Sequence, residues 1–151
     1  MQFTTRRWIL AAVASLMILT LAGGHRAAAQ NSVRTLGQAL LEFEEAVTWE
    51  SVSADWRGMR EGWIAAVEDA RTPNEVAAQL LRLEEAMGWH SVDAWWRGRR
   101  PSWVAEMRSA RAASTVSRGL LELERATLWS AVSAQWRGQR DPWIARVSAA
   151  R

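Results

Sequence analysis

The sequence contains no cysteine, which excludes both a disulfide framework and a lipid anchor attached through cysteine. The fold therefore has to be stabilised by packing alone. Lysine is absent as well, because all 19 basic residues are arginine. The planar guanidinium of arginine binds carboxylates through two hydrogen bonds and stacks on indole rings, which lysine does not do. This composition favours carboxylates and tryptophans as the partners of the basic groups.

Residues 1–29 have the three regions of an export signal: Arg6 and Arg7, an apolar run over 8–22, and the small residues of 27–29. The apolar run is about 15 residues long, short of the roughly 20 that a membrane-spanning helix needs. We therefore expect a cleaved signal and no stable membrane span. Cleavage after Ala29 would leave one domain, 30–151, in the periplasm or outside the cell.

The stretch Thr5-Arg6-Arg7-Trp8-Ile9-Leu10 resembles the twin-arginine export motif, in which two arginines precede apolar residues. Ala11 stands where that motif usually has lysine, and paired arginines also occur in ordinary export signals. Both export routes therefore remain open. The resemblance to the twin-arginine motif implies export of an already folded protein.

A surplus of positive charge is missing from the expected mature domain. The whole chain has a formal net charge of +3, but Arg6, Arg7 and Arg26 lie in the signal. From Gln30 onwards, 16 arginines face 16 acidic residues, so this part is formally neutral. Binding to nucleic acid depends on excess positive charge placed against phosphates. We therefore expect no nucleic-acid partner.

Catalytic and metal-binding patterns are absent too. The sequence has no paired histidines, no glycine-rich phosphate loop and no nucleophile motif. Adjacent carboxylates such as Glu44 and Glu45 diverge by about 100° on a helix, so they do not converge on one substrate. His90 is replaced by Glu50 and Ser130 at equivalent positions of the repeats described next, which indicates an incidental surface residue. We expect a protein that is not an enzyme and uses no cofactor or metal.

The chain repeats itself three times with a shift of 40 residues, in copies that cover 32–71, 72–111 and 112–151. Such a period is typical of tandem arrays of small helical units. Most recurring positions are apolar, as a core requires. The most prominent are three tryptophans per copy: Trp49, Trp56 and Trp63; Trp89, Trp96 and Trp103; and Trp129, Trp136 and Trp143.

Each copy is expected to begin with an amphipathic helix. Leu36, Leu40, Phe43 and Val47 form one apolar stripe at helical spacing. The second copy opens with Thr72-Pro73-Asn74-Glu75, which combines an N-cap, a proline at the first helical position and a capping-box glutamate.

Three leucines of these helices, Leu41, Leu81 and Leu121, lie outside the apolar stripe and predict a second buried face. In a stacked array the neighbouring repeat would supply that face.

The rest of each copy predicts a short helix near 51–57, a turn at Gly58 and a third helix over about 61–70. Gly98 and Gly138 occupy the same position as Gly58, and Pro101 and Pro142 follow the glycines where an unbroken helix would be disrupted. The prediction is therefore an all-α protein with a long, a short and a third helix per repeat. The copies would stack as a small armadillo-like α-solenoid or helical array, an analogy of size and layout.

The tryptophans have two interpretations. Most are expected in the core of a unit that has few other large side chains. Alternatively, one indole per repeat could be exposed, where its ring can stack on sugars or anchor a partner protein. Trp95 occurs only in the second copy and is the preferred exposed contact. The candidate contact residues are Trp95, Trp56, Trp96, Trp136, Arg60, Arg100 and Arg140.

A carboxylate at the border of the two apolar faces recurs in every copy and needs a partner because it is partly buried. We expect a repeated structural ion pair with the recurring arginines nearby. Its members are Glu44, Glu84 and Glu124, with Arg57, Arg97 and Arg137 as the assigned partners.

Three functions follow from these observations. The leading hypothesis is an exported, non-catalytic repeat protein that binds or scaffolds another protein, because repeat arrays offer extended surfaces. The alternatives are a module that binds cell-wall polysaccharide through exposed tryptophans, and a structural protein that associates with itself through uncapped array ends.

Overall fold

The computed structural model describes the backbone of residues 6–151 and the side chains of residues 23–151. The predicted export signal therefore lies largely outside the described side chains, and residues 1–5 lie outside the description altogether. The described part contains six α-helices and no strand, which confirms the all-α prediction. The helices are α1 (Arg6–Ala46), α2 (Trp56–Asp69), α3 (Pro73–Ala86), α4 (Trp96–Arg108), α5 (Ala113–Ala126) and α6 (Trp136–Ala149).

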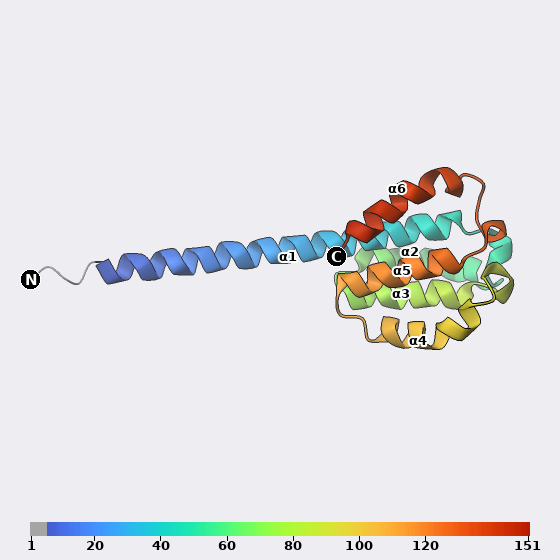
Figure 1. Ribbon diagram of the computed structural model, residues 1–151, viewed down its shortest axis with the longest axis horizontal. Helices are drawn as coiled ribbons and strands as arrows, with labels where there is room; N and C mark the ends of the chain where they lie inside the picture. The colour runs from blue at the N-terminus through green and yellow to red at the C-terminus, as the bar shows by residue number, and fades with distance from the viewer. Residues whose placement is uncertain (1–5) are drawn as a thin grey trace, which may run out of the picture.

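The helices form two concentric layers. The first helices of the three repeats, α1, α3 and α5, contact one another and make the centre of the bundle. Each second helix lies outside, between its own first helix and that of another repeat: α2 on α1 and α3, α4 on α3 and α5, and α6 on α5 and α1. Figure 1 shows the resulting bundle, from which the N-terminal part of α1 protrudes.

The three repeats close on themselves, a point that the sequence left open. The helical array is as expected, whereas the armadillo-like arrangement is not confirmed. In an open stack the first and third repeats would not meet. Here α6 packs on α1, and the indole Nε1 of Trp143 donates a hydrogen bond to the carbonyl of Ala39 at 2.9 Å. The same bond joins Trp63 to Gln79 and Trp103 to Gly119. Each repeat therefore binds the next in the same way, and the third binds the first.

Backbone hydrogen bonds close the ring a second time at one end of the bundle, called here the loop end, where each first helix gives way to a short 3₁₀ turn. The turns are Trp49–Ser51, Trp89–Ser91 and Trp129–Ala131. Two hydrogen bonds join each pair of repeats: Ser53 N to Ala86 O and Gly88 N to Ser51 O; Asp93 N to Ala126 O and Leu128 N to Ser91 O; Ser133 N to Ala46 O and Thr48 N to Ala131 O.

The predicted turn at Gly58 was wrong, and so was the short helix near 51–57. The helix α2 starts at Trp56 and continues through Gly58, and α4 and α6 likewise contain Pro101 and Pro142. Both prolines, and the glycines before them, lie on the exposed side of their helices, where a carbonyl that loses its amide partner can bind water.

The capping prediction for the second repeat is confirmed. The Thr72 hydroxyl accepts a hydrogen bond from the backbone amide of Glu75, and the Glu75 carboxylate accepts from that of Thr72. Backbone hydrogen bonds from Arg71 and Thr72 hold the pKa of Glu75 below its usual range. In the third repeat Ala112 occupies the N-cap and offers no side-chain oxygen.

The leucines outside the apolar stripe are half-buried and pack against the core, as the second-face prediction requires. The centre is filled mainly by six fully buried tryptophans together with Phe43 and leucines.

One contact between repeats places a large side chain, that of Met107, against a glycine, Gly119. At Gly119 on α5, an added Cβ would overlap the Met107 sulfur of α4. The equivalent pairs are Gln79 with Val67 and Ala39 with Val147, where a smaller side chain replaces methionine. Met107 and Gly119 therefore pair the longest side chain at the one position with the absence of a side chain at the other, a combination that occurs at this junction and not at the other two.

Closure predicts that the third repeat cannot be removed without loss of the fold. A chain ending at Arg111 would lose two inter-repeat junctions and expose the apolar faces of α1 and α3. We expect no cooperative unfolding transition from this variant in urea, monitored by circular dichroism. A cooperative transition with an m-value about two thirds of that of the full chain would contradict the closed arrangement, because it would show that two repeats fold on their own.

A circular permutant supplies the matched control. The Ser32 hydroxyl donates to the Arg151 carbonyl at 3.1 Å, so the two ends of the bundle domain are adjacent. Joining Arg151 to Ser32 recreates the natural Arg71–Thr72 connection, and the chain can be opened between those two residues. We expect this permutant, which keeps all three repeats, to unfold cooperatively.

The missing N-cap gives a stabilising substitution. We expect Ala112→Ser to raise the free energy of unfolding by about 1 kcal/mol, because the new hydroxyl can accept a hydrogen bond from one of the free backbone amides in the first turn of α5. Urea denaturation measures the change. A decrease would show that α5 does not begin at Ala113.

Candidate binding site at the loop end

A buried carboxylate joins the two helices of every repeat. Glu44, near the C-terminal end of α1, is only 5% exposed. It accepts a hydrogen bond from the Trp56 indole at 2.9 Å, and the Arg60 guanidinium binds both of its oxygens at 2.8 to 3.0 Å. Glu84 has the same contacts with Trp96 and Arg100, and Glu124 with Trp136 and Arg140.

The repeated ion pair was expected, but its assigned arginine partners were wrong. The partners are Arg60, Arg100 and Arg140, not Arg57, Arg97 and Arg137. The reason is helical spacing: Trp56 and Arg60 are four residues apart on α2 and share a face, whereas Arg57 points about 100° away. The hydrogen bonds that Arg60, Arg100 and Arg140 donate to the buried carboxylates raise the pKa of these arginines, while burial opposes the rise.

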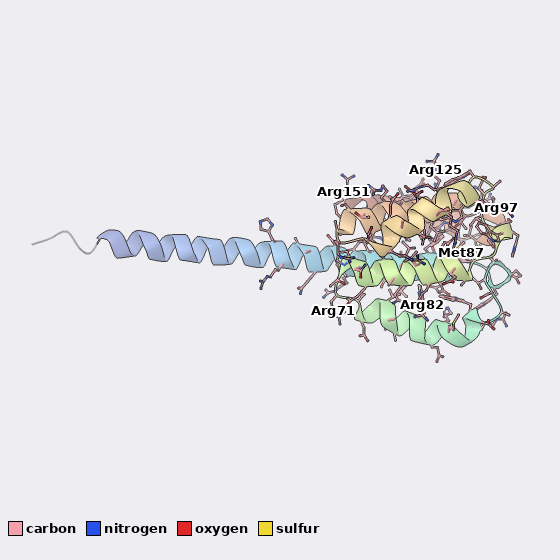
Figure 2. The ribbon with its side chains drawn as sticks, turned by 90° about the horizontal axis from the view of Figure 1, so that it is seen from below. Arg71, Arg82, Met87, Arg97, Arg125 and Arg151 are labelled. Carbon is pink, nitrogen blue, oxygen red and sulfur yellow. The ribbon has the colours of Figure 1, made fainter. Side chains whose placement is uncertain are left out.

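Three exposed indoles surround the loop end, one from each repeat. Trp49, Trp89 and Trp129 are 45%, 50% and 50% exposed. Each lies at the start of a 3₁₀ turn, just beyond its first helix. Figure 2 shows Arg97, which stacks on Trp89, at this end of the bundle, while Arg71 and Arg151 mark the opposite end, where α1 leaves.

The predicted contacts Trp56, Trp96 and Trp136 are therefore corrected. They are at most 1% exposed, because their rings fill the core and their indole N–H groups bind the buried carboxylates. Trp95 is 43% exposed and meets Trp96 edge-on at 5.7 Å. Its side chain is accessible, and its role as a contact stays a prediction.

Two guanidinium groups lie over each exposed indole. The nearer ones belong to Arg57, Arg97 and Arg137, at 4.8, 5.2 and 5.1 Å from the ring centroids of Trp49, Trp89 and Trp129. The arginines that bind the buried carboxylates lie at 5.7 to 5.9 Å. Cation–π attraction orders these rings although they are exposed. Within the described residues no carboxylate forms an ion pair with Arg57, Arg97 or Arg137.

A hollow lies beside each exposed indole. Its volume is about 170 Å³ at Trp49, 190 Å³ at Trp89 and 70 Å³ at Trp129. The buried glutamate, the arginine bound to it and a valine line all three hollows. Each hollow therefore combines a flat apolar ring with fixed hydrogen-bonding groups. All three are smaller than a pocket that encloses a whole ligand, so each could hold only the edge of a ligand that lies on the exposed indole.

Other chemistry is sparse in the described part of the chain. It holds no cluster of three or more histidines or carboxylates able to bind a metal ion. The His90 ring is exposed and its Nε2 lies 2.9 Å from the Glu50 carbonyl, to which it donates. Among the helices whose side chains are described, none is both long and apolar enough to cross a membrane.

Sequence reasoning missed Trp49, Trp89 and Trp129 as the exposed indoles. One signal could have singled them out: each follows the last apolar-stripe position by two residues, so it falls outside the helix. The next residue is polar in every copy, as Glu50, His90 and Ser130.

The fold and the site together define a closed, three-repeat helical domain with an aromatic and cationic site in each repeat. Residues 30–97 match the model of a family described as "Domain of unknown function (DUF8799)". The match covers the first repeat and the second as far as the arginine that stacks on Trp89. No curated protein and no solved structure matches the chain.

The buried carboxylate makes a direct prediction about stability. Glu84→Ala would leave the Arg100 guanidinium and the Trp96 N–H without their partner, and we expect a loss of about 2 kcal/mol in the free energy of unfolding. Solvent screens part of the cost, because Arg100 is about one third exposed. The matched control is Glu85→Ala, an exposed neighbour, with an expected change within about 0.5 kcal/mol. Equal losses would contradict the role of Glu84.

Proposed function

We propose that the protein is an exported, non-catalytic module that binds polysaccharide of the cell envelope through Trp49, Trp89 and Trp129. The observation that carries this proposal is the exposure of one indole per repeat, beside a hollow with fixed polar groups, at the same end of the domain.

The chemistry of each hollow suits a sugar ring. The apolar face of a sugar can stack on a flat indole, and its hydroxyl groups can bind a guanidinium or carboxylate at the rim. The arginine stacked on each indole covers part of the ring and holds it in place, so little side-chain freedom remains to be lost on binding.

Three sites on one domain suit a repetitive ligand. When one site is occupied, further units of the same polymer are held close to the remaining sites, so weak individual contacts add up to a stable complex. A polysaccharide offers such a series of equivalent units.

The position of α1 supports this arrangement. Its N-terminal part leaves the bundle at the end opposite to the loop end, and residues 23–30 are exposed. Loss of residues 1–29 would thus remove no core side chain among those described. A chain that kept them would present the three indoles away from its N-terminal segment.

Binding to another protein is the second candidate, favoured by one observation. Trp95 is exposed in the second repeat only, so it offers an asymmetric apolar contact. The original reason for a scaffold, an extended surface on an open array, does not apply to a closed ring. Self-association through uncapped ends loses its motivation in the same way, because the third repeat covers the first.

The proposal is tested with the variant Trp49→Ala/Trp89→Ala/Trp129→Ala. We expect the parent protein to bind insoluble peptidoglycan, and its tryptophan fluorescence to respond to N-acetylglucosamine oligomers. Loss of one stacking contact should cost about tenfold in affinity, so the triple variant should lose at least about a hundredfold.

Trp95→Ala serves as the matched control for removal of an exposed indole. It should leave glycan binding unchanged. If neither the parent nor the control bound peptidoglycan or responded to the oligomers, the proposal would be refuted. If instead only Trp95→Ala disrupted a complex recovered from the cell envelope, the protein-binding candidate would replace it.

A further inference from the structure

The three hollows share a plan but differ in charge. The residue after the buried carboxylate lines each hollow, and it is Glu45 in the first, Glu85 in the second and Arg125 in the third. It is exposed in all three copies. The charge at this position of the rim is therefore negative in the first two hollows and positive in the third.

Two further positions at this end lose their negative charge towards the third repeat. Glu50 at the first 3₁₀ turn becomes His90 and then Ser130. Asp55, just before α2, becomes Trp95 and then Gln135. The first site is therefore rich in carboxylates, whereas the third has none at these positions.

The third hollow is lined by two arginines, Arg125 and Arg140, and one neutralised carboxylate, and a third guanidinium lies beside it over the Trp129 ring. Glu124 is already bound through both oxygens by Arg140. Arg137 stacks on Trp129 and has no ion-pair partner among the described residues, and Arg125 forms none either. The remaining carboxylate that acts on Arg140 is that of Asp141, next to it in the chain.

We propose that the surface around Trp129 binds an anionic sugar, with the sugar ring on the indole and its carboxylate or phosphate on Arg125, which lines the adjoining hollow, and on Arg137, which lies over the indole ring. This inference rests on the proposed glycan function and adds the ligand class. A guanidinium binds either anion through two hydrogen bonds, which makes such contacts both strong and directional. The hollow at Trp49, lined by Glu45, would repel the same group.

The difference in charge between the three sites would then serve recognition of the ligand. A polymer that carries an acidic group on only some of its units can place the acidic unit at the third site and neutral units at the other two. The domain would thereby read the pattern of charge along the chain as well as the sugar rings themselves.

The test uses two backgrounds that each keep one exposed indole. Trp49→Ala/Trp89→Ala keeps the third site, and Trp89→Ala/Trp129→Ala keeps the first. Two matched probe pairs separate charge from sugar: a galacturonic acid oligomer against its methyl ester, and glucose 6-phosphate against glucose. Binding is measured by tryptophan fluorescence at low and high salt.

We expect the third-site background to bind the charged probe of at least one pair about tenfold more tightly than its neutral partner, and high salt to reduce this difference. Adding Arg125→Glu should abolish the preference. Adding Glu45→Arg to the first-site background should create one. Both substitutions change exposed side chains, so the fold should be retained, and the unfolding midpoint in urea checks this.

The outcomes separate this inference from the proposed function. If charged and neutral probes bound equally and neither substitution changed their ratio, glycan binding would stand and the charge inference would be overturned. If no probe bound either background, both would be overturned. A preference in the galacturonate pair alone would identify the carboxylate as the recognised group, and one in the phosphate pair alone would identify the phosphate.

Discussion

The buried carboxylate at the end of each first helix is the interaction on which the rest of this structure depends. Glu44 fixes the indole of Trp56 in the core and the guanidinium of Arg60 at the surface. Arg60 in turn lies over the exposed ring of Trp49, together with Arg57. One charge thus links the two helices of a repeat and positions groups of the candidate site. A buried charge is costly without partners, and three donor groups in every repeat remove that cost.

Much of the local structure could be predicted because it depends on neighbours in the sequence. The apolar stripe of α1 and the capping box at Thr72 are read from spacing alone. The continuation of α2 through Gly58 could not be read in this way, since the side chains of Trp56 and Trp63 hold the helix in the core. Ring closure depends on contacts such as Trp143 with Ala39, which are distant in sequence and leave no periodic signal.

The candidate site was predicted only in part for a similar reason. The repeated ion pair between a glutamate and an arginine was predicted, and one exposed indole per repeat was the alternative interpretation of the tryptophans. The exchange of roles between Arg57 and Arg60 depends on which face of α2 meets α1, and that is a property of packing. Trp49 was grouped with the core because it recurs in every copy, as Trp56 and Trp63 do, but its ring is exposed at the surface.

The pairing of Met107 with Gly119 distinguishes one junction of the ring from the other two. A side chain at position 119 would meet the end of Met107, whereas the equivalent positions carry a side chain and face a shorter valine. Methionine is flexible and can move its end aside, so the pairing favours one neighbour without excluding the others. The other inter-repeat contacts, such as the indole hydrogen bonds, recur at all three junctions. The methionine junction is therefore the place where three similar copies differ in how they fit their neighbours.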